Sequence, residues 1–249
     1  VISHNRQRNE KKLWSSRGEG EPLTMITGAH EGEEAAMVVD TLKWLKRYAG
    51  CPYREIAIFY RINALSRVYE DQLRLNDIPY RVIGGIKFYD RAEIRDILGY
   101  LRVIENPRDG TALTRIINRP TRGIGRKSLT VLFNEAVTRR ASIWDIMLEV
   151  REQPVDGISG KARTGIINLV LLINEWREFL KNHPPCELLE KILRDTNYED
   201  SLGGTDMEVI SRRENVEQLL SALGEFEESY PDEGLTGFLE RIALVRPED

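Results

Sequence analysis

The stretch that decides the fold is EIAIFYRINALSRVYEDQLRLNDIPYRVI, residues 55–83. It begins with the apolar run 55–60 and ends with the run 78–83, and each has the length and composition of a buried parallel strand. Between them, apolar residues at helical spacing predict a helix over 65–76. This order predicts a βαβ unit with a parallel sheet.

The residues before this stretch repeat the same alternation. The segment PLTMIT, residues 22–27, predicts a first strand, and apolar residues at helical spacing predict a helix over 31–47. Gly50, Cys51 and Pro52 end that helix. We therefore expect three parallel strands, which make a small sheet and indicate that it is part of a larger one.

The pattern of the sequence changes after the third strand. Helical periodicity continues to the end of the chain and is interrupted by short breaks that contain glycine, proline or small polar residues. The four clearest helices are expected at 129–138, 163–181, 187–196 and 211–230. The fold class that we expect is α/β followed by all-α, with an α/β domain over residues 1–95 and a helical domain over residues 96–249.

Composition excludes several classes of protein. The 249 residues are 41% hydrophobic and 31% charged, which is enough apolar material for a buried core. No run of about 18 apolar residues indicates a membrane span, and no secretory leader is recognisable. The two cysteines, Cys51 and Cys186, cannot form a disulfide framework. Together these features predict a cytoplasmic protein.

The net charge of −4 conceals two segments of opposite sign. Residues 115–140 contain seven basic residues and one acidic residue, a net charge of +6, whereas residues 199–249 contain 14 acidic and 4 basic residues, a net charge of −10. The acidic segment is typical of a solvated face. The basic segment surrounds a glycine turn and therefore favours an anionic partner.

The most informative motif is Pro120-Thr-Arg-Gly-Ile-Gly-Arg-Lys-Ser128. Its glycines allow positive φ and close approach of a ligand, and the helix that follows presents free N–H groups and the positive end of its dipole. Arg122, Arg126 and Lys127 add mobile charge, and Ile124 is expected to pack between the two helices. The motif predicts a hairpin that grips a nucleic-acid backbone without reading bases. An ordinary glycine-rich connection between helices is the alternative.

Two further segments carry weaker signals. The turn Ile158–Arg163 has one glycine and two basic residues, although a solvated loop is the simpler interpretation. Arg61 and Asn63 follow the strand 55–60, at the edge where open α/β sheets bind ligands. Such donors suit phosphate or nucleic acid, and a plain capped loop is the alternative.

The segment 84–89 could contact unpaired bases. Its paired glycines permit close approach, Lys87 could hold a phosphate, and Phe88 and Tyr89 could stack on bases. A core aromatic pair below a tight turn is the alternative.

Motifs of catalysis are absent from the sequence. It contains no G-x-x-x-x-G-K-[ST] phosphate loop and no G-x-G-x-x-G. The three histidines lack metal-ligand spacing, and no serine lies in a nucleophile elbow. The chain by itself therefore shows no catalytic centre.

Several of these motifs occur together in one known family. The run Ala57–Arg67 (AIFYRINALSR) resembles the A-[IV]-[LF]-[YF]-R-x-N-x-x-S-R element of the superfamily 1 DNA helicases of the UvrD, PcrA and Rep group. The resemblance continues, in the family's order and spacing, at Ile78-Pro-Tyr, Gly84-Gly-x-x-Phe88, Glu93-Ile-Arg-Asp96, Tyr100-Leu-Arg102, Asn106-Pro-x-Asp109, Pro120-Thr-Arg-Gly-Ile-Gly125 and Arg213-Glu-Asn-Val-Glu217. It covers nearly the whole chain.

This resemblance implies a fragment of a larger motor. These helicases have two RecA-like subdomains of the P-loop NTPase type, 1A and 2A, with helical insertions 1B and 2B. Residues 1–95 resemble the first part of 2A, a partial parallel sheet, and residues 96–249 resemble the inserted helical 2B domain. The ATP phosphate loop and the metal motif belong to 1A, so the fragment is expected to bind no cofactor and to be inactive alone.

The resemblance also implies DNA-contacting residues. The positions that match those facing single-stranded DNA are Arg61, Asn63, Arg67, Lys87 and Phe88. The positions assigned to duplex DNA are Thr121, Arg122, Gly123, Ile124, Gly125, Arg126, Lys127, Ser128 and Lys161. No catalytic or metal-binding residue is expected.

The function implied for the full-length protein is ATP-dependent 3′ to 5′ translocation and unwinding, with ATP and Mg as cofactors. The expected partners are single-stranded DNA, duplex junctions and repair or replication proteins, without a membrane, at a cytoplasmic, nucleoid-associated location. Two alternatives remain open. The chain could be a non-catalytic regulatory module that docks a protein on its acidic half, or the helicase part of a helicase-nuclease.

Overall fold

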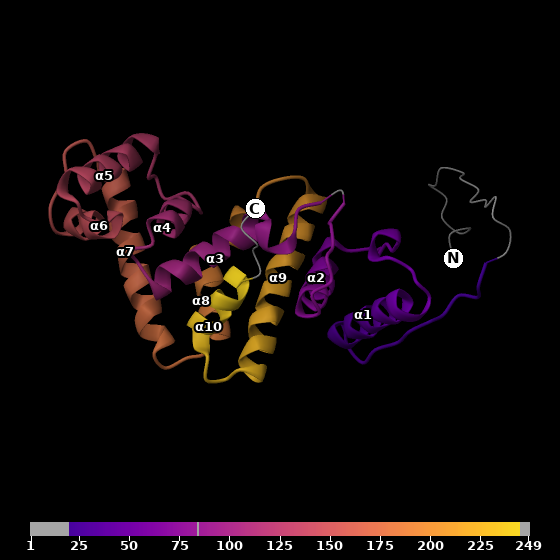
Figure 1. Cartoon of the computed structure of the whole chain (residues 1–249). Coiled ribbons are helices and arrows are strands. Elements are labelled where there is room, and N and C mark those ends of the chain that lie inside the picture. The colour runs from indigo at the N-terminus through magenta and orange to yellow at the C-terminus, as the bar shows by residue number, and fades with distance from the viewer. Residues whose placement is uncertain (1–19, 84, 245–249) are drawn as a thin grey trace.

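The computed structural model describes residues 20–83 and 85–244, and every regular element in that part is a helix (Figure 1). The α-helices are α1 (Glu31–Tyr48), α2 (Ser66–Leu75), α3 (Ala92–Glu105), α4 (Gly110–Ile116), α5 (Arg126–Arg139), α6 (Ile143–Glu152), α7 (Gly160–Leu180), α8 (Pro185–Thr196), α9 (Asp206–Ser229) and α10 (Gly234–Leu244). Short 3-10 helices are η2 (Tyr53–Glu55), η3 (Asn63–Leu65), η4 (Phe88–Asp90) and η5 (Glu199–Ser201). Among these described helices, none has the length and apolar character of a membrane span.

The predicted RecA-like parallel sheet is a wrong prediction, because the described residues contain no β-strand. Segments 22–27, 55–60 and 78–83 make no backbone hydrogen bonds with one another. A parallel strand is stable only when its N–H and C=O groups pair with a neighbouring strand. A short apolar run has the same pattern in a strand and in an irregular extended segment, so the pattern alone does not distinguish them.

Apolar residues of two of these segments pack against helices instead. Ile56 and Ile58 are partly buried against a small core between α1 and α2. The buried members of this core are Val39, Leu42, Leu73 and Ile78. In the first segment, by contrast, Leu23 and Met25 are almost entirely exposed. The helices predicted on either side of the second segment are confirmed as α1 and α2.

The predicted all-helical region is confirmed and has a separate, larger core. Helix α3 is central to it, since most of its 14 residues are buried and it contacts α4, α7, α9 and α10. The rings of Tyr100 in α3 and Trp176 in α7 meet edge to face at 5.7 Å. Burial of such large side chains supplies much of the hydrophobic stabilisation. The predicted domain boundary between residues 95 and 96 falls within α3 and stays a prediction.

Several of the helices begin at a polar side chain that caps their first turn. Asp109 caps α4 through its side chain. Ser142 and Asp145 form a capping box at the start of α6, and Thr205 and Glu208 form another at the start of α9. Each such cap contributes about 1 kcal/mol by satisfying N–H groups that the first turn leaves unpaired.

A polar junction joins the α1–α2 unit to the larger helical unit. Arg67 of α2 is 2% exposed and donates to Glu225 at 3.0 Å and to Gln218 at 3.2 Å, both on α9. Arg91, which precedes α3, also donates to Asn215 of α9. Figure 1 shows the result as an elongated molecule, with α1 near one end, α5 and α6 at the other, and α9 between them.

Candidate nucleic-acid interface

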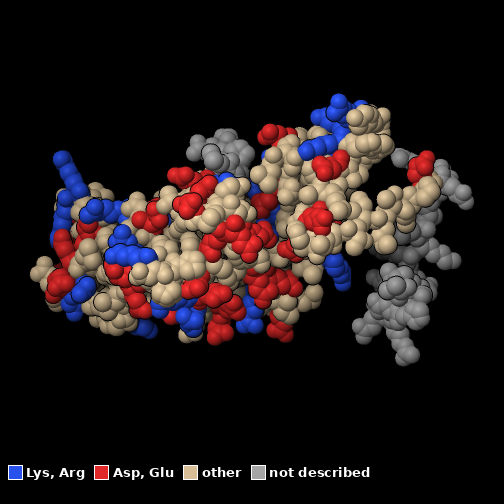
Figure 2. Space-filling view, turned by 90° about the horizontal axis from the view of Figure 1, so that it is seen from below, with Lys and Arg blue, Asp and Glu red and all other residues tan. Residues whose placement is uncertain are grey.

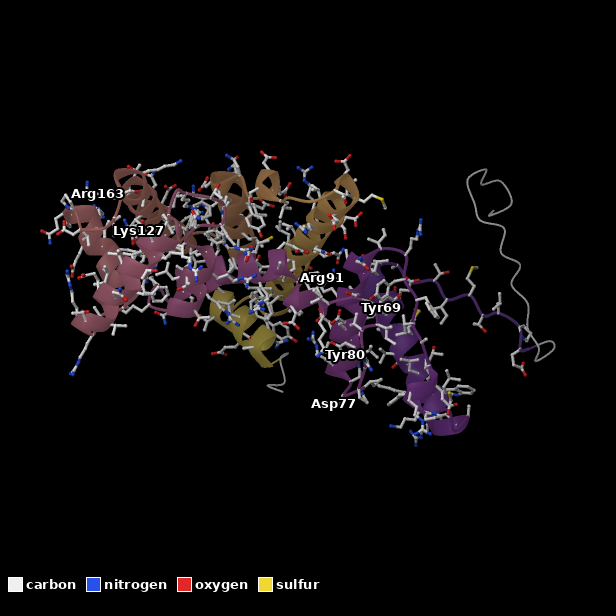
Figure 3. The ribbon with its side chains drawn as sticks, turned by 90° about the horizontal axis from the view of Figure 1, so that it is seen from above. Tyr69, Asp77, Tyr80, Arg91, Lys127 and Arg163 are labelled. Atoms are coloured by element: carbon white, nitrogen blue, oxygen red, sulfur yellow. The ribbon has the colours of Figure 1, made fainter. Side chains whose placement is uncertain are left out.

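The glycine turn predicted from the sequence connects α4 to α5, at the end of the molecule where Figure 3 labels Lys127. Gly123 has a φ of +75°, a left-handed conformation that favours glycine. Gly125 has ordinary extended backbone and is the N-cap of α5; a Cβ there would meet no described atom within 4 Å. One glycine therefore makes the turn, and the other leaves the N-terminus of α5 uncovered.

Two anchors hold the turn in place. The Oδ1 atom of Asn118 accepts the backbone N–H groups of Arg122, at 2.7 Å, and of Ile124, at 3.2 Å. The side chain of Ile124 is completely buried in the larger core. The turn is therefore held in one shape without a ligand, which lowers the entropic cost of binding.

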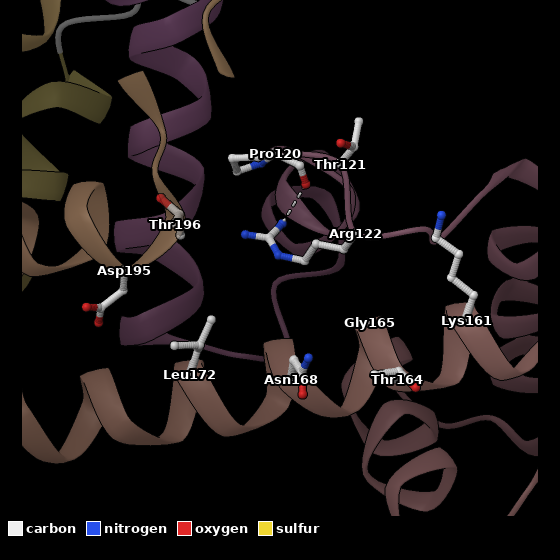
Figure 4. Close-up of a pocket in the computed structure, with 10 residues that line it drawn as sticks. All are labelled: Pro120, Thr121, Arg122, Lys161, Thr164, Gly165, Asn168, Leu172, Asp195 and Thr196. Carbon is white, nitrogen blue, oxygen red and sulfur yellow. Dashed lines mark hydrogen bonds between the residues drawn. The ribbon is translucent and has the colours of Figure 1, made fainter. Parts of the chain in front are cut away.

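The side chain of Arg122 points into the protein rather than toward solvent. Its guanidinium donates to the carbonyl oxygens of Ile116 at 2.8 Å, Arg119 at 3.0 Å and Pro120 at 3.2 Å, the last drawn in Figure 4. It also donates to the hydroxyl of Tyr100. Burial raises the pKa of Tyr100 although the Arg122 charge opposes this, so the hydroxyl keeps its proton and donates to the Arg119 carbonyl. Arg122 thus satisfies carbonyl groups at the end of α4.

Helix α7 passes directly beneath the turn. A Cβ on Gly165 would lie 2.2 Å from the carbonyl oxygen of Arg122, so this position accepts only glycine. The aliphatic chain of Lys161 covers Gly123, since a Cβ on that glycine would lie 2.8 Å from Lys161 Cγ. The two basic turns of the sequence are therefore neighbours in space, and Lys161 reaches solvent beside the first of them.

Part of the basic charge near the turn is neutralised within the protein. Arg115 and Arg119 pair with Asp96 at 2.7 and 3.1 Å. Arg126 and Lys127 are exposed, and no described residue forms an ion pair with either. No side chain in the described part of the chain caps α5, so its first N–H groups also remain available. Free charge is thus concentrated at the N-terminus of α5.

The predicted duplex-binding residues therefore differ in accessibility. Those exposed to solvent are Thr121, Gly125, Arg126, Lys127 and Lys161. Those partly or fully buried are Arg122, Gly123, Ile124 and Ser128. Thr121 and Lys161 line the same pocket, and the other exposed residues follow the turn at the start of α5.

The residues predicted to face single-stranded DNA divide in the same way. Arg61, Asn63 and Lys87 are exposed. Phe88 is completely buried, and its backbone N–H donates to Glu70 at 3.2 Å. Gly84, the first of the paired glycines, lies outside the described residues.

Arg67, the remaining predicted single-strand contact, lies inside the junction with α9. Besides Glu225 it pairs with Asp71 at 3.4 Å and with Glu31 at 3.7 Å. Burial by itself would lower the pKa of Arg67, but the hydrogen bond and charge of Glu225 outweigh it and hold the pKa above its usual value. The guanidinium is therefore permanently charged and occupied by carboxylates of its own chain.

Sequence reasoning missed three residues that shape the turn, namely Tyr100, Asn118 and Gly165. Tyr100 precedes Arg122 by 22 positions, and no local pattern connects them. Asn118 gave no signal beyond its place before Pro120. A glycine inside the apolar helix α7 was a usable signal, because glycine in a helix interior usually marks a close approach of another backbone.

The described residues do not fit ATP or Mg. No group of three or more His, Cys, Asp or Glu side chains among them is placed to hold a metal ion. The sequence also lacks the glycine-rich loop and lysine that cradle nucleotide phosphates. What this surface offers instead is backbone N–H groups and free cations, which suit a phosphate backbone.

Comparison with known proteins agrees with a nucleic-acid role. The sequence model of the UvrD-like helicase C-terminal domain matches residues 1–249. The chain is 35% identical to the ATP-dependent DNA helicase UvrD1 of Mycobacterium tuberculosis and 36% identical to the ATP-dependent DNA helicase PcrA of Staphylococcus epidermidis. Each comparison covers 100% of this chain and 34% of the relative, so the chain spans about a third of the length of these relatives. The chain belongs to the UvrD-like helicase C-terminal domain family.

Proposed function

We propose that this chain is the DNA-engaging part of an ATP-dependent DNA helicase that moves 3′ to 5′. Family membership and the two helicase relatives support the class of activity. The observation that carries the DNA contact is the uncapped N-terminus of α5, where Arg126 and Lys127 are exposed and unpaired among the described residues.

The turn would hold duplex DNA by its backbone. The N–H groups of the first turn of α5 and the positive end of its dipole attract one phosphate, and Arg126, Lys127 and Lys161 attract its neighbours. The absence of a side chain at Gly125 lets the phosphate approach closely. None of these groups distinguishes one base from another, so the contact positions the duplex without sequence preference.

Single-stranded DNA would bind at the exposed residues Arg61, Asn63 and Lys87. They supply donors for phosphate in the α1–α2 unit, away from the glycine turn. Arg67 and Phe88 are both buried, so we assign them structural roles rather than direct contacts with the strand.

ATP hydrolysis would depend on residues other than those described. We expect the isolated 249-residue chain to show no DNA-stimulated ATP hydrolysis, because its sequence lacks a phosphate loop. A phosphate-release assay with ATP, Mg²⁺ and single-stranded DNA measures this. Turnover above the level of a buffer blank would contradict the proposal.

The duplex contact can be tested with Lys127→Ala. Fluorescence anisotropy with a labelled duplex at about 50 mM salt should show affinity reduced roughly five- to tenfold, because one phosphate contact is lost. The matched control is Lys181→Ala, which removes an exposed lysine at the other end of α7, paired with Glu178 at 2.7 Å. Equal affinity for both variants would overturn the duplex assignment.

A further inference from the structure

A groove runs beside the glycine turn. Figure 4 shows one wall formed by Pro120, Thr121 and Arg122 and the other by a row of residues on α7. Its volume is about 450 Å³. Gly165 also lines the groove, and because it has no side chain the backbone of Arg122 packs closely against α7 at this point.

The α7 wall of the groove presents hydrogen-bond donors, and no acidic residue of α7 lines it. Lys161, Thr164 and Asn168 are spaced by three and four positions, so they lie on one face of the helix, and all three are exposed. The Thr164 hydroxyl donates to the Gly160 carbonyl at 3.1 Å. Lys161 and Asn168 make no hydrogen bond or ion pair with a described residue, so their donors are free for a ligand.

The far end of the groove has the opposite charge. Asp195 lines it and accepts from Trp176 at 2.9 Å and from Lys191 at 2.9 Å. Burial alone would raise the pKa of Asp195, but these partners outweigh it and keep the pKa below its usual value, so the carboxylate is ionised. Lys161 therefore attracts an anionic ligand at one end of the groove, and the Asp195 carboxylate repels it at the other.

We infer that Lys161 and Asn168 form a row of contacts along α7 for the sugar-phosphate backbone of DNA, which we call the α7 track. It would hold the same DNA strand that the glycine turn contacts. The two residues are seven positions apart, which corresponds to about 10 Å along the helix and matches the axial rise of three nucleotides in one strand of B-form DNA. The groove is continuous with the exposed Thr121, so a strand leaving the turn enters it directly. This inference rests on the proposed duplex function.

The test compares two asparagines of α7. Asn168→Asp replaces the amide donor by a negative charge in the groove, whereas Asn174→Asp makes the same change on another face of the same helix, outside the groove. Both are measured in the full 249-residue chain by anisotropy with a labelled duplex. Asn168→Asp should weaken binding about tenfold, because a charge-assisted hydrogen bond is lost and repulsion is gained. Asn174→Asp should change it less than twofold.

A gain-of-charge variant keeps the test decisive if the first one folds poorly. Asn168→Lys should tighten duplex binding and steepen the slope of log K against log salt by about 0.9, as one more phosphate contact predicts. Circular dichroism checks that every variant keeps its helices. If Lys127→Ala weakens binding but Asn168→Asp equals Asn174→Asp and Asn168→Lys gains nothing, the α7 track is wrong while the turn stands. If Lys127→Ala also has no effect, the duplex function itself fails.

Discussion

Gly165 is a single position in α7 whose lack of a side chain allows the glycine turn of the proposed interface to pack closely. The residue lies in α7, far along the chain from the turn, yet the Arg122 carbonyl oxygen would lie 2.2 Å from a Cβ at this position. Any side chain there would have to displace backbone rather than the flexible end of a side chain. Because the turn is also pinned by Asn118, it cannot move away without losing two hydrogen bonds.

Gly165→Ala should therefore lower the free energy of unfolding by about 1–3 kcal/mol, as overpacking does. Gly224→Ala is the matched control, since Gly224 lies within α9 and a Cβ there meets nothing within 4 Å. That change should be neutral or stabilise the protein by about 0.5–1 kcal/mol, because alanine favours a helix. Urea denaturation measures both. Equal stability of the two variants would show that the turn relaxes freely.

At the residue level, the sequence indicates the exposure of some side chains in the candidate site and not of others. Arg126 and Lys127 were accessible to prediction because they flank the turn within the motif itself. Arg122 was not, because its inward orientation depends on Tyr100, which another helix supplies. Arg67 belongs to the same sequence motif as Arg61, and nothing local in the sequence distinguishes them. Arg67 is buried because α9 packs against it.

At the scale of elements, the junction between α2 and α9 depends on one buried cation. Arg67 is surrounded by carboxylates from α1, α2 and α9, and it is the only one of these groups that is fully desolvated. Loss of a buried ion's partner costs much more than loss of a surface pair. The contribution of this junction to stability therefore rests mainly on Arg67.

Arg67→Ala should lower the free energy of unfolding by about 3 kcal/mol, because it removes the buried cation that joins α2 to Glu225 of α9. Asp71 keeps Arg74 as an ion-pair partner. Arg213→Ala is the control, since Arg213 on α9 is exposed and pairs only at 3.9 Å with Glu199 and 3.7 Å with Asp200. It should cost less than about 0.5 kcal/mol. Chemical denaturation of both variants gives the comparison, and a similar loss in each would refute a special role for Arg67.

The start of α6 should make stability depend on pH. Hydrogen bonds from Ser142, helped by Arg108, hold the pKa of Asp145 below its usual value. The carboxylate is thus favoured in the folded state, so its contribution is complete above the pKa of the unfolded chain, about 4, and is lost as the pH falls through the lower folded value.

Asp145→Asn should therefore lower the free energy of unfolding by about 1 kcal/mol at pH 7, and this difference from the original protein should shrink toward pH 3. Denaturation curves at several pH values measure it. Asp156→Asn, at an exposed position without a described partner, is the control and should show no such trend. A difference that stays constant down to pH 3 would contradict the role of the Asp145 charge.

Helices were predicted well and the sheet was not, for a physical reason. A helix satisfies its own backbone within a few residues, so periodicity and caps such as Ser142 are sufficient to locate it. A parallel strand needs a neighbour, which no local pattern can supply. Segment 55–60 has the composition of a strand, but in the described structure Ile56 and Ile58 pack against α1 and α2 instead.

For the whole molecule, the separation of charge along its length is the main electrostatic feature. Figure 2 shows acidic side chains gathered over the middle of one face, with basic side chains toward both ends, including the end that carries α5 and α6. A polyanion approaching the middle is repelled, and one approaching the end is attracted. This distribution of charge favours an anionic partner at the ends of the molecule over one at its middle.

The salt dependence of duplex binding should reveal how many cations act. If only Arg126, Lys127 and Lys161 contact phosphates, log K should fall with log salt at a slope of about −3. If all seven basic residues of 115–140 did so, the slope would be about −6. Titration between about 50 and 200 mM salt separates these values. The smaller slope is expected, because Arg115, Arg119 and Arg122 are occupied within the protein.

Helix α7 extends from the proposed DNA contact to the middle of the molecule, so a rotation at one end would displace the other. Gly165 of α7 packs against the turn. About 18 Å further along the helix, Arg177 donates a hydrogen bond to the Ile104 carbonyl at 3.1 Å. A tilt of about 5° around that fixed point would move the turn by about 1.5 Å, half the length of a hydrogen bond. Small rearrangements in packing near Trp176 would therefore produce larger displacements at the proposed DNA-binding surface.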